Sequence, residues 1–163
     1  MTADVAAEVI ASLIENGLTI AVAESLTGGL LVAELTGIPG ASAVVLGGVV
    51  AYHTALKQTV LGVDAGLLAT HGPVHPEVAR QMADRVRTVL AVNGVPADIG
   101  LSTTGVAGPG PHDGHAPGTV YLGLAIGEAV TSLKLELGGD RVAIRQQTVS
   151  ESLLRLRSAL ESR

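Results

Sequence analysis

Apolar side chains recur every three or four positions near both ends of the chain and again in its middle. This spacing predicts amphipathic helices over residues 2–16, 76–90 and 140–160. Asn16-Gly17 is typical of a helix end, and Pro76 suits the first turn of the middle helix. The positions expected to point inward are Val5, Val9, Leu13 and Ile14, then Val78, Met82, Val86 and Val89, and finally Val142, Ile144, Val149, Leu153, Leu154 and Leu160.

Short apolar runs between these helices predict a sheet. Residues 19–23, 44–52 and 97–103 are apolar, and each run leads into a polar or glycine-rich segment. The second run is continuous enough to predict burial on both faces. Two alternating runs, 119–126 and 130–137, are separated by three residues and predict a hairpin. Alternating helices and strands followed by a hairpin indicate an α/β fold with a mixed sheet covered by helices.

The first candidate for chemistry is the turn Glu24-Ser25-Leu26-Thr27-Gly28-Gly29, which joins a predicted strand to a predicted helix. A serine in such a turn projects above the sheet, where nearby N–H groups stabilise an oxyanion. The glycine pair permits close approach of a ligand. The alternative is structural, because Ser25 or Thr27 is also a favoured helix N-cap. The segment is neither a G-x-S-x-G elbow nor a nucleotide-binding loop that ends in G-K-[ST].

The second candidate is Tyr52-His53-Thr54-Ala55-Leu56-Lys57, which follows the second strand. A lysine acts as a general base only when its pKa falls from about 10.4 to roughly 7–8, a shift worth ~4 kcal/mol. Desolvation near an apolar strand lowers the pKa, whereas the negative net charge of the chain works against that change. The alternative is a solvated lysine on a helix, with Tyr52 as an amphipathic residue at a strand end.

The third candidate is Ser102-Thr103-Thr104-Gly105-Val106-Ala107-Gly108-Pro109-Gly110, which begins at the end of the third strand. Consecutive N–H groups in a glycine-rich turn form a nest for a phosphate or an oxyanion. All three candidates lie at the carboxyl ends of predicted strands, where α/β sheets place their ligands. The sequence therefore predicts one site built from three segments.

Other polar residues have weaker claims to a function. Arg141 and Arg145 lie one helical turn apart, and they either bind a phosphate together or pair with Asp140 and nearby acids. The segment His112-Asp113-Gly114-His115 has no evident third metal ligand, so we expect a solvated loop and no metal site. His71 and His75 flank Pro73 in another predicted loop, and they are expected to be turn or surface residues.

Composition narrows the possible functions. The 163 residues include no Cys, Phe or Trp, which excludes thiol chemistry and disfavours a base-stacking surface for single-stranded nucleic acid. The formal charge of −5 disfavours binding to phosphate backbones. No apolar run reaches the ~18–20 residues of a membrane span, and the N-terminus lacks the basic start of a signal peptide. We expect a cytoplasmic protein without nucleic-acid or membrane partners.

Four segments in this order resemble the C-terminal domain of CinA-type competence/damage-inducible proteins. They are AESLTGG, VVAYHTALKQTVLGV, TTGVAGPG followed by GTVYLGLA, and GDRVAIRQQ, and the resemblance runs from about Ile10 to Leu160. It implies a three-layer α/β/α fold, with residues 1–163 as one domain. It also implies a nicotinamide-nucleotide amidohydrolase. Such an enzyme converts nicotinamide mononucleotide and water to nicotinate mononucleotide and ammonia, by a Ser–Lys mechanism that needs no metal or cofactor.

The resemblance also implies roles for individual residues. The implied catalytic residues are Ser25, Lys57 and Tyr52, and the implied substrate-binding residues are Thr27, Gly28, Gly29, Thr104, Gly105, Ala107, Gly108 and Arg141. The chain departs from the family pattern after Tyr52, where His53-Thr54 replaces an expected Ser-Asn pair, and the loop 111–117 has its own sequence. The first departure bears on nucleotide specificity, and the second bears on the shape of the pocket mouth.

Two other functions are compatible with the same sequence. One is a non-catalytic nucleotide-binding or regulatory domain that keeps the pocket without turnover. The other is a small α/β assembly module, which the 47% hydrophobic composition favours because apolar surface is typical of an interface. For the same reason we expect a homo-oligomer, a dimer or larger.

Overall fold

The computed structural model describes all of residues 1–163 and has a five-stranded sheet at its centre, with the strand order β2-β1-β3-β4-β5. The first three strands in this order are parallel, and β4 and β5 form an antiparallel hairpin beside β3. The strands are β1 (Ile20–Glu24), β2 (Val45–Val50), β3 (Ile99–Gly105), β4 (Thr119–Ile126) and β5 (Ala129–Glu136). The predicted mixed sheet is therefore confirmed.

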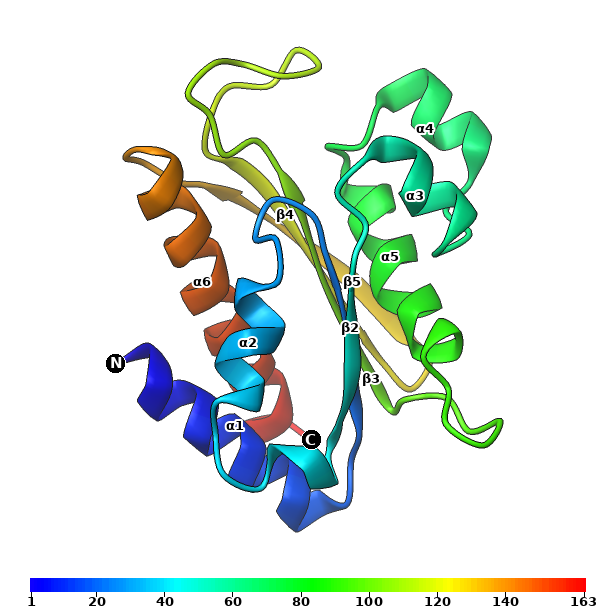
Figure 1. Cartoon of the computed structure of the whole chain (residues 1–163), viewed down its shortest axis with the longest axis vertical. Helices are drawn as coiled ribbons and strands as arrows, with labels where there is room; N and C mark the ends of the chain where they lie inside the picture. Colours follow the sequence, from blue (N-terminus) through cyan, green and yellow to red (C-terminus); the bar gives the residue numbers. More distant parts are fainter.

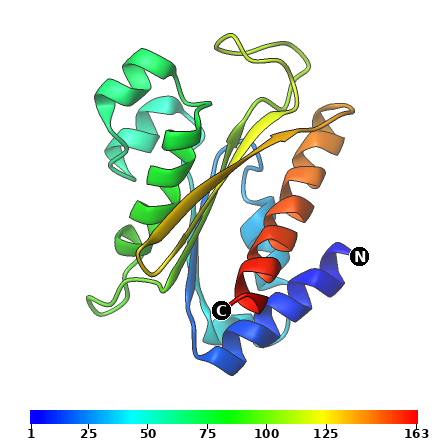
Figure 2. The same cartoon turned by 180° about the vertical axis from the view of Figure 1, so that it is seen from behind.

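Helices cover both faces of this sheet, which gives the expected three-layer α/β/α arrangement (Figures 1 and 2). One layer contains α1 (Thr2–Asn16), α2 (Leu30–Thr36) and α6 (Arg141–Glu161), and the other contains α3 (Thr54–Thr59), α4 (Ala65–His71) and α5 (Pro76–Val89). A single 3-10 turn, η1 (Ala41–Ala43), precedes β2. None of the helices combines the length and apolar character that a bilayer span requires.

The core lies in two main clusters, one on each side of the sheet. Most of the predicted inward positions are buried, but Ile14, Val89, Val142 and Leu154 are exposed. In α6 the buried residues repeat at 144, 148–149, 152–153, 156 and 160, which is the spacing of one helical face. Val142 and Leu154 fall off this face, so their predicted burial is wrong.

Strand β2 is an edge strand, and its predicted burial on both faces is also wrong. It pairs with β1 alone, and its residues are partly or fully exposed. The apolar content of a strand does not tell an edge strand from a central one, because the place of a strand in the sheet is set by which other strands pair with it. The fully buried strand is β1, which lies between β2 and β3.

Helix α5 lies unusually close to the sheet because two strand positions beneath it are glycines. A Cβ atom at Gly100 would overlap the backbone carbonyl oxygen of Ala83, and one at Gly123 would overlap that of Ala79. The Ser102 hydroxyl donates to the same Ala79 oxygen at 2.6 Å. Close packing of α5 thus fixes β3, whose carboxyl end carries one wall of the site.

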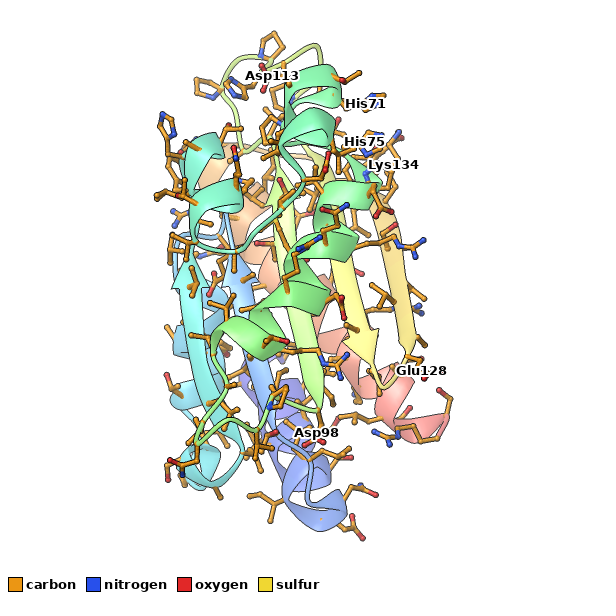
Figure 3. All side chains as sticks on the ribbon, turned by 90° about the vertical axis from the view of Figure 1, so that its right-hand side faces the viewer. His71, His75, Asp98, Asp113, Glu128 and Lys134 are labelled. Carbon is orange, nitrogen blue, oxygen red and sulfur yellow. The ribbon has the colours of Figure 1, made fainter.

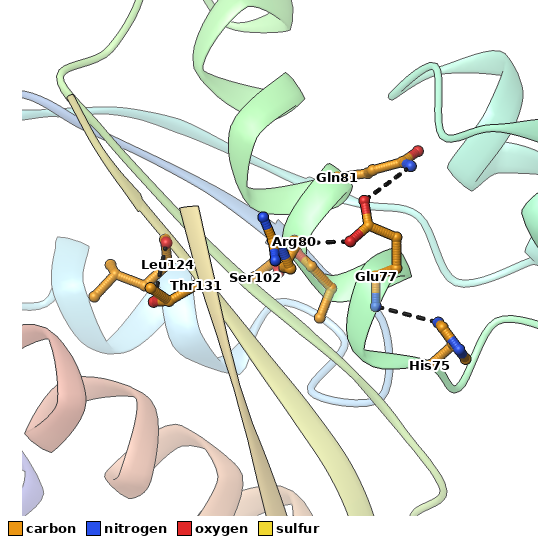
Figure 4. A network of polar contacts seen from close by, with 8 residues as sticks. His75, Glu77, Arg80, Gln81, Ser102, Leu124 and Thr131 are labelled. Atoms are coloured by element: carbon orange, nitrogen blue, oxygen red, sulfur yellow. Dashed lines mark hydrogen bonds and ion pairs between the residues drawn. The ribbon is translucent and has the colours of Figure 1, made fainter. Parts of the chain in front are cut away.

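Side chains at the start of α5 pair locally (Figure 4). The His75 Nδ1 atom accepts from the Glu77 N–H and caps the helix. The Glu77 carboxylate contacts Gln81 at 3.2 Å and Arg80 at 3.4 Å. These contacts define where α5 begins and where the preceding loop, which reaches the site, must end.

Candidate active site

A cleft of about 500 Å³ opens at the carboxyl ends of β1 and β3. All three predicted segments contribute to it: Ser25 and Leu26, then residues 52–54 with Lys57, then residues 104–112. Pro73, Val74 and Arg141 complete the lining. The expectation that three segments distant in sequence form one site is met, because β1 and β3 are parallel neighbours and β2 delivers the chain beside them.

Ser25 stands directly after β1, at the start of a tight turn. Its carbonyl oxygen accepts from the Gly28 N–H at 3.1 Å, which closes the turn. Its own N–H donates to the Thr103 hydroxyl of the neighbouring strand at 3.3 Å. The side chain of Ser25 is 7% exposed and faces the cleft. Ser25 is not the N-cap of α2, which is Gly29.

Lys57 is the largest of the fully buried side chains, and its amine meets Ser25. The Nζ atom donates to the Ser25 Oγ at 2.9 Å and to the Ala51 carbonyl oxygen at 2.7 Å. The Tyr52 carbonyl oxygen lies 3.4 Å away. No carboxylate pairs with this amine, and desolvation by burial lowers the pKa of Lys57 from 10.5 to about 8. Lys57 is therefore not the solvated lysine of the alternative interpretation.

The arrangement around Nζ accommodates both protonation states, because its three oxygen neighbours also match the three N–H groups of the ammonium. A neutral lysine has two N–H groups and one lone pair, whereas the ammonium has three N–H groups and none. The carbonyl oxygens of Ala51 and Tyr52 accept the two N–H groups. In the neutral form the lone pair is then left for Ser25, so that the hydroxyl donates to Nζ, as it must when the amine takes its proton.

Tyr52 and Arg141 also line the cleft and contact each other. The Arg141 guanidinium donates to the Tyr52 hydroxyl at 3.0 Å and to the Gly108 carbonyl oxygen at 2.7 Å. The Tyr52 hydroxyl thus faces Arg141, and only its backbone carbonyl reaches Lys57. Thr104 is buried at the cleft wall and donates to the Pro73 carbonyl oxygen at 2.7 Å. Arg141 therefore links the tyrosine to the glycine-rich turn.

Thr27, Gly28 and Gly29 lie outside the cleft. The Thr27 side chain is fully buried and shares a hydrogen bond with Thr103 at 2.9 Å. The N–H groups of Gly28 and Gly29 are already bonded, to the Ser25 carbonyl and to a Glu24 carboxylate oxygen. These three residues therefore do not line the cleft, and their assignment to the substrate stays a prediction, while Gly105, Ala107 and Gly108 do line it.

Several backbone N–H groups at the cleft wall remain free to bind a ligand. Those of Leu26, Ala107 and Gly108 donate no hydrogen bond within the chain. The Val106 N–H, by contrast, donates to Thr119. Free N–H groups beside a nucleophile are the elements of an oxyanion hole. The sequence predicted such N–H groups in the turn after Ser25 and in the glycine-rich turn, without naming Leu26.

The cleft carries no carboxylate, although the chain is acidic overall. Its ionisable side chains are Lys57, Arg141, Tyr52, His53 and His112. The His53 Nδ1 atom accepts from the Ala55 N–H at 3.2 Å, which leaves the Nε2 atom as the proton-bearing nitrogen of the neutral ring. Local charge in the cleft is thus opposite in sign to the net charge of −5 and suits an anionic ligand group.

His71 and His75 lie at the same end of the molecule as Asp113 (Figure 3). His71 and His75 stack with ring centroids 4.5 Å apart, and His112 lies 3.2 Å from Asp113. Desolvation, with contributions from His71 and His115, lowers the pKa of His75. No three His, Asp or Glu side chains converge as metal ligands would.

Two functional contacts were not anticipated from the sequence. Arg145 does not join Arg141 at a phosphate site or pair with an acid; it donates to the carbonyl oxygens of Leu26 and Thr27 at 2.9 and 3.0 Å. Glu24 is fully buried, and its carboxylate accepts three backbone N–H groups at the start of α2. A carboxylate directly before a strand–helix turn was the available signal for Glu24.

Comparison with known proteins gives a consistent picture. A family model described as the CinA C-terminal domain matches residues 2–160. A relative from Geobacillus kaustophilus, named as competence-damage inducible, is 52% identical over 82% of this chain and 31% of its own length. A CinA-like protein from Frankia casuarinae is 46% identical over 89% of this chain and 32% of its own length. The chain thus spans about a third of the length of these relatives.

Solved structures share the whole fold. A competence-damaged protein (CinA) superfamily protein from Klebsiella pneumoniae superposes with a TM-score of 0.93 at 30% identity, covering 100% of this chain and 99% of that one. The competence/damage inducible protein CihA from Agrobacterium tumefaciens gives a TM-score of 0.88 at 34% identity, covering 98% of this chain and 95% of that one.

Proposed function

This chain belongs to the CinA C-terminal domain family, and on that basis we propose that it hydrolyses the carboxamide of nicotinamide mononucleotide to nicotinate mononucleotide and ammonia. One observation carries the proposal: the Lys57 Nζ atom lies 2.9 Å from the Ser25 Oγ atom at the base of the cleft. A buried amine with a pKa of about 8 beside a serine hydroxyl is the pairing that a Ser–Lys hydrolase requires.

The first half of the reaction forms an acyl-enzyme. The neutral Lys57 amine takes the Ser25 hydroxyl proton as the Oγ atom attacks the carboxamide carbon. The carbonyl oxygen becomes an oxyanion, and the free N–H groups of Leu26, Ala107 and Gly108 are the donors available to it. The C–N bond then breaks as the Lys57 ammonium returns the proton to the leaving nitrogen, and ammonia departs from an ester at Ser25.

The second half of the reaction repeats these steps, with water as the nucleophile and the Ser25 Oγ atom as the leaving group. Lys57 takes a proton from the water that attacks the ester carbon, and the same N–H groups stabilise the second oxyanion. Cleavage of the C–O bond returns a proton to the Ser25 Oγ atom and releases the carboxylate product. The balance is one amide and one water consumed, with one carboxylic acid and one ammonia formed.

Charge and size in the cleft support a nucleotide of this kind. A cleft of about 500 Å³ lies within the range of roughly 300–1,000 Å³ usual for small-molecule sites. The Arg141 guanidinium at the cleft wall suits the phosphate. No carboxylate lines the cleft, so none pairs with the cationic ring of the substrate and holds the ring away from Ser25. The carboxamide therefore remains available to this serine.

The test is ammonia release from nicotinamide mononucleotide by the purified chain. Wild-type protein should release ammonia, while Ser25→Ala and Lys57→Ala should lose at least ~10³-fold of that rate, the usual scale for removing a nucleophile or its base. Lys134→Ala is the matched control, because Lys134 is the only other lysine and is exposed on β5. Ammonia release by Ser25→Ala at the wild-type rate would exclude Ser25 as the nucleophile.

Calorimetry separates this function from the non-catalytic alternative. Binding of the nucleotide by folded wild-type protein without ammonia release would support a regulatory domain and contradict the amidohydrolase. Binding by Ser25→Ala together with loss of turnover would support catalysis, since removal of one hydroxyl leaves the rest of the cleft in place.

A further inference from the structure

The turn that carries Ser25 is held by two charged side chains that do not reach the cleft. On one side, the Glu24 carboxylate accepts from the N–H groups of Gly29 at 3.0 Å, Leu31 at 3.1 Å and Val32 at 2.8 Å. Glu24 itself is the last residue of β1, so its backbone lies before the turn and its side chain binds the chain after it. The carboxylate therefore joins the two ends of the turn.

These three hydrogen bonds also satisfy the start of α2. A helix leaves its first N–H groups without internal partners, and α2 has no other side-chain cap. Glu24 is fully buried, so water does not compete for these bonds. The position of α2 relative to β1, and with it the path of the turn, depends on this one carboxylate.

On the other side, Arg145 of α6 binds the middle of the turn. Its Nε and Nη2 atoms donate to the carbonyl oxygens of Leu26 and Thr27 at 2.9 and 3.0 Å. The planar guanidinium fixes two consecutive peptide groups at once, which a single ammonium does not do. Gly28 has a φ of +61° and leaves room for the guanidinium, because a Cβ atom there would lie 3.2 Å from Nη2.

We propose that Glu24 and Arg145 are positioning residues that hold the Ser25 hydroxyl against the Lys57 amine and hold the Leu26 N–H at the oxyanion site. The proposal rests on the proposed role of Ser25 as nucleophile. Neither side chain lines the cleft, so neither contributes to substrate binding. Loss of either one should lower kcat and leave KM nearly unchanged, because the reacting atoms move while the binding groups stay.

The size of the effect follows from the sensitivity of such reactions to geometry. Displacement of a reacting atom by about 1 Å costs up to ~10²-fold in rate. We therefore expect Glu24→Gln and Arg145→Lys to lower kcat by roughly 10- to 100-fold, with KM within about twofold of wild type. Gly28→Ala should act in the same direction, since its methyl group displaces the Arg145 guanidinium.

Matched controls exist elsewhere in the chain. Asp64 caps α4 through the Leu67 N–H at 2.7 Å, and it lines no part of the cleft. Arg87, like Arg145, donates to two backbone carbonyl oxygens, those of Ala97 and Gly127. These lie near the opposite end of the sheet from the site. Asp64→Asn and Arg87→Lys should therefore keep the wild-type kcat even where they lower the melting temperature.

The experiment measures kcat and KM for every variant, together with the rate at which a sulfonyl fluoride labels Ser25, followed by mass spectrometry. Slower labelling and lower kcat in the three variants, with controls unchanged, support the proposal. Wild-type kcat in folded Glu24→Gln and Arg145→Lys overturns it, as does a raised KM with unchanged kcat. If Glu24→Gln does not fold, Arg145→Lys and Gly28→Ala decide by the same criteria.

The two readouts also separate this proposal from the proposed function. If Ser25→Ala is inactive and the positioning variants are fully active, only the positioning proposal fails. If wild-type protein releases no ammonia but its Ser25 is labelled quickly, and labelling slows in the variants, the function fails and the positioning proposal stands. Wild-type protein that shows neither turnover nor labelling overturns both.

Discussion

The buried amine of Lys57 should make the reaction depend on pH in a defined way. Burial lowers the pKa of Lys57 from 10.5 to about 8, and only the neutral form takes the Ser25 proton. With a pKa of about 8 the amine is neutral in about 9% of molecules at pH 7 and about 90% at pH 9. With the ordinary pKa the neutral fraction at pH 7 would be about 0.03%, so burial raises it about 300-fold.

The value of kcat/KM should therefore rise about fivefold from pH 7 to 8 and about tenfold in total by pH 9, where it levels off, because it reports the free enzyme. The assay is ammonia release at substrate concentrations well below KM, between pH 7 and 10. Above pH 7 the substrate phosphate, with a second pKa of about 6, is already dianionic and adds little to the slope. Circular dichroism at each pH checks that the protein stays folded.

Lys57→Arg completes this test, since arginine keeps the charge and does not lose its proton in this range. It should be inactive at every pH, while Lys134→Ala should reproduce the wild-type profile. A flat profile between pH 7 and 9, a profile that falls through pH 8, or an active Lys57→Arg variant would refute the argument that a neutral Lys57 is the base.

Three further predictions concern stability and binding. Because the folded-state pKa of Lys57 lies below the unfolded value of 10.5, charging this lysine opposes folding below pH 8, and that penalty disappears as pH rises to 10.5. In urea unfolding, the unfolding free energy of wild type relative to that of Lys57→Met should therefore increase by about 3 kcal/mol between pH 7 and 10.5. A difference that does not change with pH would contradict the lowered pKa. Arg141→Lys should raise KM about tenfold with kcat little changed, because an ammonium does not offer a phosphate the forked pair of N–H donors of a guanidinium, and an unchanged KM would contradict a role of Arg141 in binding the phosphate. Gly100→Ala should cost more than about 2 kcal/mol of unfolding free energy, because the methyl group would overlap the Ala83 carbonyl, whereas Gly110→Ala, with open space around it, serves as its control.

Local patterns in the sequence were enough to predict most of the elements and the central pair of the site. Ser25 and Lys57 each follow an apolar strand, and parallel strands bring their carboxyl ends to one edge, so their meeting could be expected. The exposure of β2 could not be expected, because its composition matches that of a central strand and only the strand order places it at the edge.

The supporting contacts of the site were harder to foresee. Arg145 and Arg141 are one turn apart on the same helix, yet Arg141 faces Tyr52 and Arg145 faces the turn after Ser25. Spacing along a helix predicts which side chains are neighbours on its surface, but it does not predict which groups of other segments they contact. The resemblance implied substrate contacts for Thr27, Gly28 and Gly29, whereas in the structure the Glu24 carboxylate is the anion at the start of α2.

Two of the three groups around the Lys57 amine belong to the main chain, the carbonyl oxygens of residues 51 and 52. Every amino acid supplies such an oxygen, so mutation of the Ala51 side chain leaves its acceptor in place. A mutational scan would therefore miss much of what orients the base. Only a change in backbone path, such as an inserted or deleted residue between 51 and 57, would remove it.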